Sequence, residues 1–235
     1  DPGTAVVAMP QVHWTDGTRF DLEAVGARCR DVGAALIVDA TQSVGALPFD
    51  VAAVQPDALI CATYKWLLGP YTMSLAWFGP RFDDGVPLEE TWIARERSRD
   101  FQHLVDYQDA YLPGAVRYDA AERSNFFLAP IAQASLELLL EWTPEAIQGY
   151  CRGLTAEMLG GLAELGYSVE DEAWRGHHLF GLRMPPSVEL APLRDRLAER
   201  NVHVSLRGTA LRLSPNVYND DADVSVLERE LGIDF

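Results

Sequence analysis

The chain has 235 residues, 48% hydrophobic and 23% charged, proportions typical of one large globular domain or two small ones. Acidic residues outnumber basic ones 35 to 19, so the net charge of −16 disfavours a nucleic-acid partner. No apolar run is long enough for a membrane span, no signal peptide is visible and the three cysteines lie far apart, which together predict a cytoplasmic protein without a membrane partner.

The first third of the chain alternates helical and strand patterns. Residues 21–33 predict an amphipathic helix, with Asp21 as its N-cap and Gly33 as its C-terminal stop. Three short apolar runs predict buried strands, at residues 35–40, 58–62 and 74–78. Strands separated by helical or loop crossovers indicate the α/β class with a mostly parallel sheet.

After residue 80 the predicted secondary structure changes from loops to helices and then to short strands with helices. Loops with short helices are expected at 81–116, and helices at 127–142, 144–165, 189–200 and after 219–221, with short strands from residue 167 onward. We therefore expect two units. Residues 1–140 form part of a large domain ending in an interdomain helix, and residues 141–235 form a smaller α+β domain.

One residue count stands out among the basic side chains. Of the 19 basic residues 18 are arginine, and Lys65 is the only lysine. A lysine amine can lose its proton and act as a nucleophile, whereas a guanidinium group stays charged. The alternative is that Lys65 is a surface lysine retained by chance. The residues around it are needed to choose between these two interpretations.

Polar side chains follow two of the predicted strands. Asp39 and Gln42 follow the first, and Thr63, Tyr64 and Lys65 follow the second. In open α/β sheets ligands bind outside the carboxyl ends of the strands, so these groups are expected in one crevice. An amine beside a carboxylate suits a cofactor with a carbonyl group. Taken singly, Asp39 would cap loop N–H groups and Tyr64 would serve packing.

These residues carry a family resemblance. The segments VDATQSVGALPFDV and PDALICATYKWLLGP resemble the class V aminotransferase family of fold-type I pyridoxal-phosphate enzymes, which includes cysteine desulfurases, selenocysteine lyase-like proteins, kynureninases and isopenicillin N epimerase-like enzymes. The shared pattern is D-x-x-Q (Asp39 to Gln42), then the lysine 23 residues after the glutamine, then Gly-Pro. The resemblance extends over essentially the whole chain, including residues 117–126 and 211–220.

The resemblance implies roles for five of these residues toward pyridoxal 5'-phosphate. Lys65 corresponds to the lysine that forms the Schiff base, and Asp39 to the partner of the pyridinium nitrogen. Gln42 corresponds to the hydrogen-bond donor to the phenolic oxygen of the ring. Thr63 and Tyr64 resemble the kynureninase variant, in which the tyrosine reaches the phosphate.

Further positions follow from the same resemblance. Arg212 matches the arginine that binds the α-carboxylate of the substrate, although a surface strand arginine is the alternative. Trp14 occupies the cofactor-side position where desulfurases often carry asparagine. Arg123 or Ser124 is expected to reach the cofactor phosphate of a partner subunit. Ser205 replaces the catalytic cysteine of desulfurases, so a persulfide mechanism is not expected.

The implied function is a pyridoxal-phosphate enzyme acting on an amino acid, a lyase cleaving a C–S or related Cβ bond. The alternatives are a class V aminotransferase or epimerase, or a non-catalytic half-subunit completed by a partner chain. Relatives carry an additional N-terminal half with the phosphate-binding loop, so we expect a homodimer or a complex with a polypeptide supplying that half. No metal site is expected.

Overall fold

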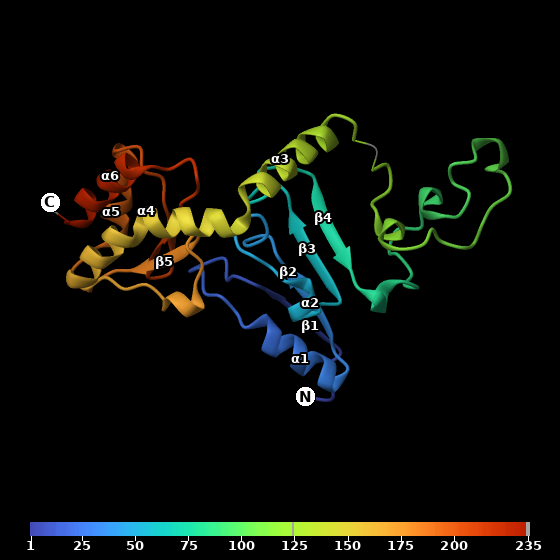
Figure 1. Ribbon diagram of the computed structural model, residues 1–235, viewed down its shortest axis with the longest axis horizontal. Coiled ribbons are helices and arrows are strands. Elements are labelled where there is room, and N and C mark those ends of the chain that lie inside the picture. The colour runs from blue at the N-terminus through green and yellow to red at the C-terminus, as the bar shows by residue number, and fades with distance from the viewer. Residues whose placement is uncertain (124, 234–235) are drawn as a thin grey trace.

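A computed structural model describes residues 1–123 and 125–233, which contain two β-sheets joined by a pair of helices (Figure 1). The first sheet has the order β1-β2-β3-β4. Its strands are β1 (Val6–Pro10), β2 (Ala35–Asp39), β3 (Ala58–Ala62) and β4 (Ser74–Phe78). The first three are parallel and β4 is antiparallel to β3, which confirms the expected α/β class with a mostly parallel sheet.

Helix α1 (Leu22–Val32) provides the crossover between β1 and β2 and ends where the sequence predicts. The Asp21 carboxylate accepts a hydrogen bond from the Ala24 N–H, and Gly33 closes the helix in the left-handed conformation at φ 75°. The short helix α2 (Val51–Val54), capped by Asp50, precedes β3. By contrast, no helix separates β3 from β4, and this short connection is compatible only with an antiparallel pair.

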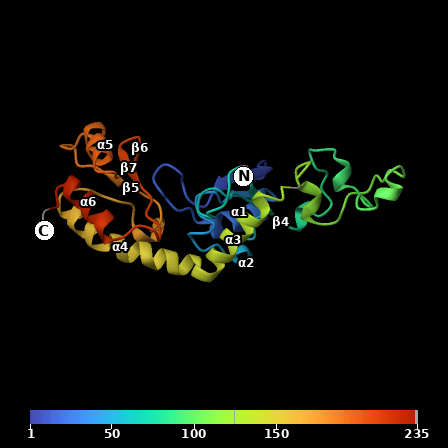
Figure 2. The same ribbon diagram turned by 90° about the horizontal axis from the view of Figure 1, so that it is seen from above.

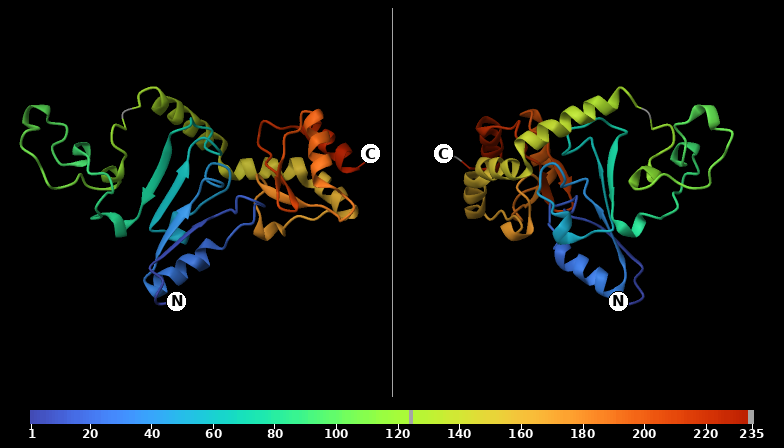
Figure 3. Two further views of the ribbon diagram at one scale, coloured as in Figure 1. Left: turned by 180° about the vertical axis from the view of Figure 1, so that it is seen from behind. Right: turned by 45° about the vertical axis from the view of Figure 1, so that its right-hand side comes forward.

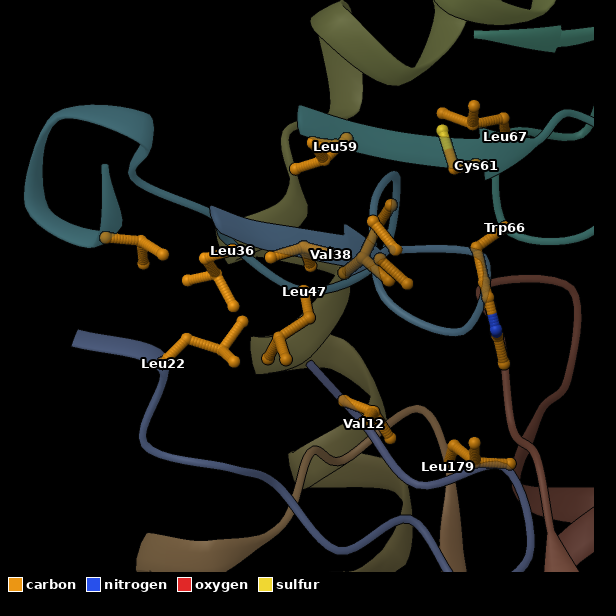
Figure 4. Packing of buried hydrophobic residues seen from close by; sticks show 14 of the residues in the cluster. Val12, Leu22, Leu36, Val38, Leu47, Leu59, Cys61, Trp66, Leu67 and Leu179 are labelled. Carbon is orange, nitrogen blue, oxygen red and sulfur yellow. The ribbon is translucent and has the colours of Figure 1, made fainter. Parts of the chain in front are cut away.

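In the described part of the chain, the large buried side chains of the first sheet gather on one of its faces. Leu36, Val38, Leu59 and Cys61 point toward the buried cluster that also contains residues of α1 and of the helices at Leu128–Trp142 and Pro144–Glu164 (Figure 4). On the opposite face, which the register gives to alternate residues, Ile60 remains 42% exposed and Val6 56% exposed. An apolar sheet face open to solvent is a surface that another polypeptide segment would cover.

Two consecutive helices connect the sheets, α3 (Leu128–Trp142) and α4 (Pro144–Glu164). They are separated by Thr143, whose φ of 65° breaks the helical path, and the long axis of α4 leads from one sheet to the other (Figure 2). Ile147 and Cys151 at the start of α4 belong to the first buried cluster. Met158 and Leu162 near its end belong to the second, so one helix contributes to both cores.

The second sheet has the order β5-β7-β6 and is antiparallel throughout. Its strands are β5 (Phe180–Arg183), β6 (Ser205–Arg207) and β7 (Ala210–Leu213), and helices α5 (Leu190–Glu199) and α6 (Asp221–Leu231) pack with it. The predicted helices are confirmed here, and Asp220 caps α6 in a capping box with Asp223. The strand expected at residues 167–170 is reduced to an isolated bridge between Ser168 and Arg183.

Residues between β4 and α3 form an irregular arm that extends away from the sheet (Figure 3). As the sequence predicts, the described residues of the arm contain only short helices. The 3₁₀ helices within residues 1–123 and 125–233 are Pro80–Phe82, Trp92–Ala94, Phe101–His103, Ala115–Tyr118 and Glu172–Trp174. No helix in the described part of the chain combines the length and apolar character that a membrane crossing requires.

Gly17 allows the loop after β1 to approach the second sheet. Its φ is 76°, and a Cβ atom at this position would lie 2.1 Å from the Leu179 carbonyl oxygen. The adjacent Asp16 carbonyl accepts a hydrogen bond of 2.7 Å from the Gly181 N–H. A residue without a side chain is therefore required for the backbone contact that holds the loop in place.

We expect Gly17→Ala to destabilise the protein more than Gly33→Ala, although both glycines have nearly the same φ. At Gly33 nothing lies within 4 Å of the added methyl group, so only the left-handed conformation is penalised, at about 1 kcal/mol. Gly17→Ala adds the clash with the Leu179 carbonyl, a further ~2 kcal/mol. Urea denaturation of both variants measures the difference, and equal losses would contradict the proposed close contact.

Candidate active site

A cavity of about 470 Å³ opens beyond the carboxyl ends of β2 and β3, against the second sheet. Several of the predicted site residues line it together, namely Trp14, Gln42, Tyr64, Lys65 and Arg212. They come from four separate loops or strands, so the fold assembles them from distant parts of the sequence. The place is the one at which open α/β sheets bind their ligands.

Lys65 lies in the loop that follows β3 and is half-buried. Burial and the nearby Arg212 guanidinium lower the pKa of the Lys65 ammonium group, while Asp39 opposes the shift. A lowered pKa increases the fraction of neutral amine, which is the nucleophilic form. The environment of Lys65 therefore suits covalent attack on a carbonyl group.

Thr63 and Tyr64 precede this lysine but point to different surroundings. Thr63 is buried, and its hydroxyl oxygen lies 2.7 Å from the Pro70 carbonyl oxygen and 3.0 Å from that of Met73. The Thr63 side chain therefore connects the two ends of the loop between β3 and β4, which carries Lys65, and it does not line the cavity. Tyr64 does line the cavity, and its ring stacks on Tyr71 with the centroids 4.5 Å apart.

Asp39 ends β2 beside the cavity, and one carboxylate oxygen accepts a hydrogen bond of 3.0 Å from the Thr41 N–H. The side chain is exposed and close enough to Lys65 to influence its pKa. It is not among the residues that line the cavity itself. Asp39 thus caps its own loop through one oxygen, and its side chain remains exposed.

Gln42 is fixed by a network that joins the two sheets. The Trp66 indole N–H donates to the Gln42 side-chain oxygen over 3.2 Å, which leaves the amide NH₂ group of Gln42 available as a donor. His178 donates from Nε2 to the Gln42 carbonyl over 2.8 Å, and its Nδ1 accepts from the Gln148 amide over 3.0 Å. Trp66 packs edge-on against His178, on the side of the core where Leu179 lies (Figure 4).

Arg212 reaches the cavity from β7. One N–H group donates to the Trp14 carbonyl over 2.7 Å, while the Nε atom is buried without a partner. Burial and the neighbouring Arg207 lower the pKa of the Arg212 guanidinium. Arg207 also lines the cavity and lies over the Trp14 ring, 5.5 Å from the ring centroid.

The remaining predicted positions lie elsewhere. Arg123 forms an ion pair of 2.9 Å with Asp119 in the irregular arm and does not line the cavity. Ser124 lies outside the described residues. Ser205 begins β6 opposite Arg212.

Two residues of the site carried no distinctive sequence signal. Arg207 is one of 18 arginines, and His178 is one of two adjacent histidines in the sequence. The alternation of β6 and β7 would have placed Arg207 beside Arg212, had the register of the hairpin been known. Nothing local marks His178 as the residue that joins the two sheets.

Comparison with known proteins agrees with this geometry. The family model "Aminotransferase class-V" matches residues 1–87. "Uncharacterized aminotransferase YcbU" of Bacillus subtilis is 27% identical over 217 residues, which cover 92% of this chain and 56% of that protein. Kynureninase of Stenotrophomonas maltophilia is 31% identical over 157 residues, covering 66% of this chain and 36% of the enzyme.

Among solved structures, the cysteine desulfurase CsdA of Escherichia coli superposes with a TM-score of 0.77 at 20% identity, covering 98% of this chain and 59% of that chain. The sequence resemblance to class V enzymes and the fold are thereby confirmed. The chain spans little more than half the length of YcbU and of this structure. Members of these families use pyridoxal phosphate.

The buried His178 makes stability depend on pH. Burial lowers the pKa of this imidazole from its ordinary 6.5 to about 4, although the hydrogen bond to Gln42 opposes the shift. As the pH falls from about 6.5 to about 4, the unfolded state binds a proton that the folded state does not. Stability is therefore fully present above this window and decreases by ~3 kcal/mol across it.

Comparing the pH dependence of stability between histidine variants separates the contribution of His178 from that of the carboxylates, which also titrate in this range. We expect His178→Gln to be less stable at neutral pH but to lose less stability on acidification than the unmodified chain. His203→Gln, at an exposed position, should retain the original pH dependence. Urea unfolding at several pH values checks this, and equal slopes for all three proteins would refute the assignment.

Proposed function

We propose that this chain, whose resemblance to class V aminotransferases is confirmed over residues 1–87, is the lysine-bearing part of a pyridoxal-phosphate enzyme that acts on an amino acid. The proposal rests on the position and the environment of Lys65. It is the only lysine of the chain, it lines the cavity, and its pKa is lowered by burial and by Arg212. An amine with these properties is suited to bind the carbonyl carbon of the cofactor.

The described residues fit such a group. The cavity of about 470 Å³ is within the size range of small-molecule sites, and the buried Nε atom of Arg212 lacks a partner that an anionic ligand would supply. When bound, pyridoxal phosphate serves as an electron sink for bonds at the substrate's α-carbon. Lys65 would hold its carbonyl carbon, Asp39 would keep its ring nitrogen protonated, and Gln42 would donate to its phenolic oxygen.

Arg212 is proposed to bind the α-carboxylate of the substrate. A guanidinium fork forms two parallel hydrogen bonds with a carboxylate, and this geometry fixes the orientation of the amino acid. The bond from Arg212 to the Trp14 carbonyl already fixes the guanidinium group, so little rotamer freedom is lost on binding. Lys65, close enough to Arg212 to respond to its charge, is placed to move a proton at the adjacent α-carbon.

Within this class we favour a lyase that cleaves a Cβ bond without a catalytic thiol. The three cysteines are buried and none lines the cavity, and burial raises the pKa of the Cys151 thiol to about 11. Similarity to kynureninases supports the lyase, whereas similarity to YcbU supports an aminotransferase as the alternative. Product analysis distinguishes them, because a transaminase releases an intact 2-oxo acid and a lyase releases a side-chain fragment.

The site also requires a phosphate-binding loop and a cover for the open face of the first sheet. Because the chain covers only 56% of YcbU and 59% of CsdA, we propose that further polypeptide supplies both, in a dimeric assembly. The exposed Ile60 and Val6 on the open face support this proposal. Light scattering tests it, since a monodisperse 26.0 kDa monomer that binds pyridoxal phosphate at micromolar concentration would contradict it.

We expect borohydride reduction in the presence of pyridoxal phosphate to label Lys65 in the complete enzyme, with the label located by peptide mass mapping. Lys65→Arg should abolish this label within the chain, because a guanidinium group cannot replace the amine. Asp39→Ala keeps the amine and should still be labelled, which makes it the matched control. A labelled chain after Lys65→Arg, at any residue other than the N-terminal amine, would overturn the assignment of Lys65.

A further inference from the structure

Two guanidinium groups, not one, face the cavity. In the β6–β7 hairpin Arg207 pairs with Ala210 and Ser205 pairs with Arg212. Side chains alternate along each strand, so Arg207 and Arg212 lie on the same face of the sheet while Leu206 and Leu211 pack toward the core on the other. The two arginines are diagonal neighbours, with about 7–8 Å expected between such positions.

Among the residues that the structure describes, no carboxylate forms an ion pair with Arg207 or Arg212. Arg207 donates from Nη1 only to the carbonyl of its neighbour Leu206 over 2.8 Å, and its buried Nε atom has no partner. The Nε atom of Arg212 is likewise buried and unpartnered. No carboxylate is among the cavity-lining residues in the described part of the chain. Donors of both forks therefore remain available to a ligand.

The local charge is opposite to that of the whole chain. Lys65, Arg207 and Arg212 line one cavity of a chain whose net charge is −16, and the pKa of both Lys65 and Arg212 is lowered partly by their cationic neighbours. Grouped cations repel one another, and an anion between them removes that cost. A single substrate carboxylate at Arg212 would leave Arg207 without a counterion.

We propose that Arg207 binds a second acidic group on the substrate, so that the amino acid processed at this site has an anionic side chain of the dicarboxylate class. The inference rests on the proposed function, because it takes Arg212 as the α-carboxylate site. Arg207 then selects the side chain by a charge-assisted hydrogen bond at the far end of a short dicarboxylate. Its position over the Trp14 ring holds the guanidinium group at the cavity wall.

The test measures ligand binding to the protein directly and does not depend on turnover. Calorimetry with glutarate, butyrate and inorganic phosphate compares a dicarboxylate, a monocarboxylate and the group that a cofactor phosphate would present. We expect glutarate to bind about tenfold more tightly than butyrate. Arg207→Gln should reduce this ratio to near one while leaving butyrate binding unchanged, and Arg212→Gln should weaken both carboxylates.

Two further variants keep the result interpretable. Arg194→Gln removes an exposed arginine of α5 that bonds Asp195 outside the cavity, and should leave the ratio unchanged. Arg207→Lys keeps the charge but not the fork, and should give an intermediate ratio, which covers the case in which Arg207→Gln does not fold. Circular dichroism verifies that each variant is folded.

The outcomes separate this inference from the proposed function. An unchanged glutarate-to-butyrate ratio in Arg207→Gln, or a loss confined to phosphate binding, would overturn the role of Arg207 as a side-chain receptor. A dicarboxylate preference that disappears with Arg207 supports it, even if borohydride fails to label Lys65. If borohydride does not label Lys65 but the preference depends on Arg207, the cofactor assignment is wrong and the dicarboxylate selectivity of the cavity is still supported.

Discussion

The hydrogen bond from the buried His178 ring to the Gln42 carbonyl joins the loop after β2 to the second sheet, and the site is arranged around it. The carbonyl can only accept, so His178 must carry its proton on Nε2 and accept from Gln148 on Nδ1. Gln148 in turn donates to Ala46 and accepts from the His177 backbone. The loop that carries Gln42 is thus bonded on both sides, and the cavity between the two sheets has fixed walls.

The network fixes the hydrogen-bond donors of the cavity at positions where an anionic ligand is proposed to bind. Trp66 fixes the Gln42 amide, and the Trp14 carbonyl fixes Arg212. Trp66 packs against His178, and the loop that carries Trp14 is closed by the backbone hydrogen bond from His13 to Thr18, so the polar groups of the cavity are oriented before a ligand arrives. Pre-oriented groups lose little conformational entropy on binding, which favours specificity as well as affinity.

The sequence predicts much of this protein because several elements carry strong local signals. The helix from Leu22 to Val32 is bounded by a capping aspartate and a left-handed glycine, and the apolar runs at 35–38 and 58–62 form strands. Lys65 was singled out as the only lysine and by its spacing from Gln42, and Arg212 was singled out by the family resemblance of residues 211–220.

What was missed depends on contacts between distant segments. β1, at Val6–Pro10, was not predicted, and its pairing with β2 is a tertiary property that no short window contains. The inward turn of Thr63 toward the Pro70 and Met73 carbonyls likewise depends on the path of the loop. Arg207 could be placed at the cavity only once the hairpin register was known.

Helix α4 has a consequence for the energetics of the whole chain. Residues in its first turns belong to the core of the first sheet, and residues in its last turns belong to the core of the second sheet. Loss of this helix would expose apolar surface at both ends, so neither half can melt without removing part of the other's stabilisation. The stabilities of the two sheets are therefore coupled through helix α4. A substitution at Ile147 should lower the free energy of unfolding of both sheets, and not only of the residues that contact it.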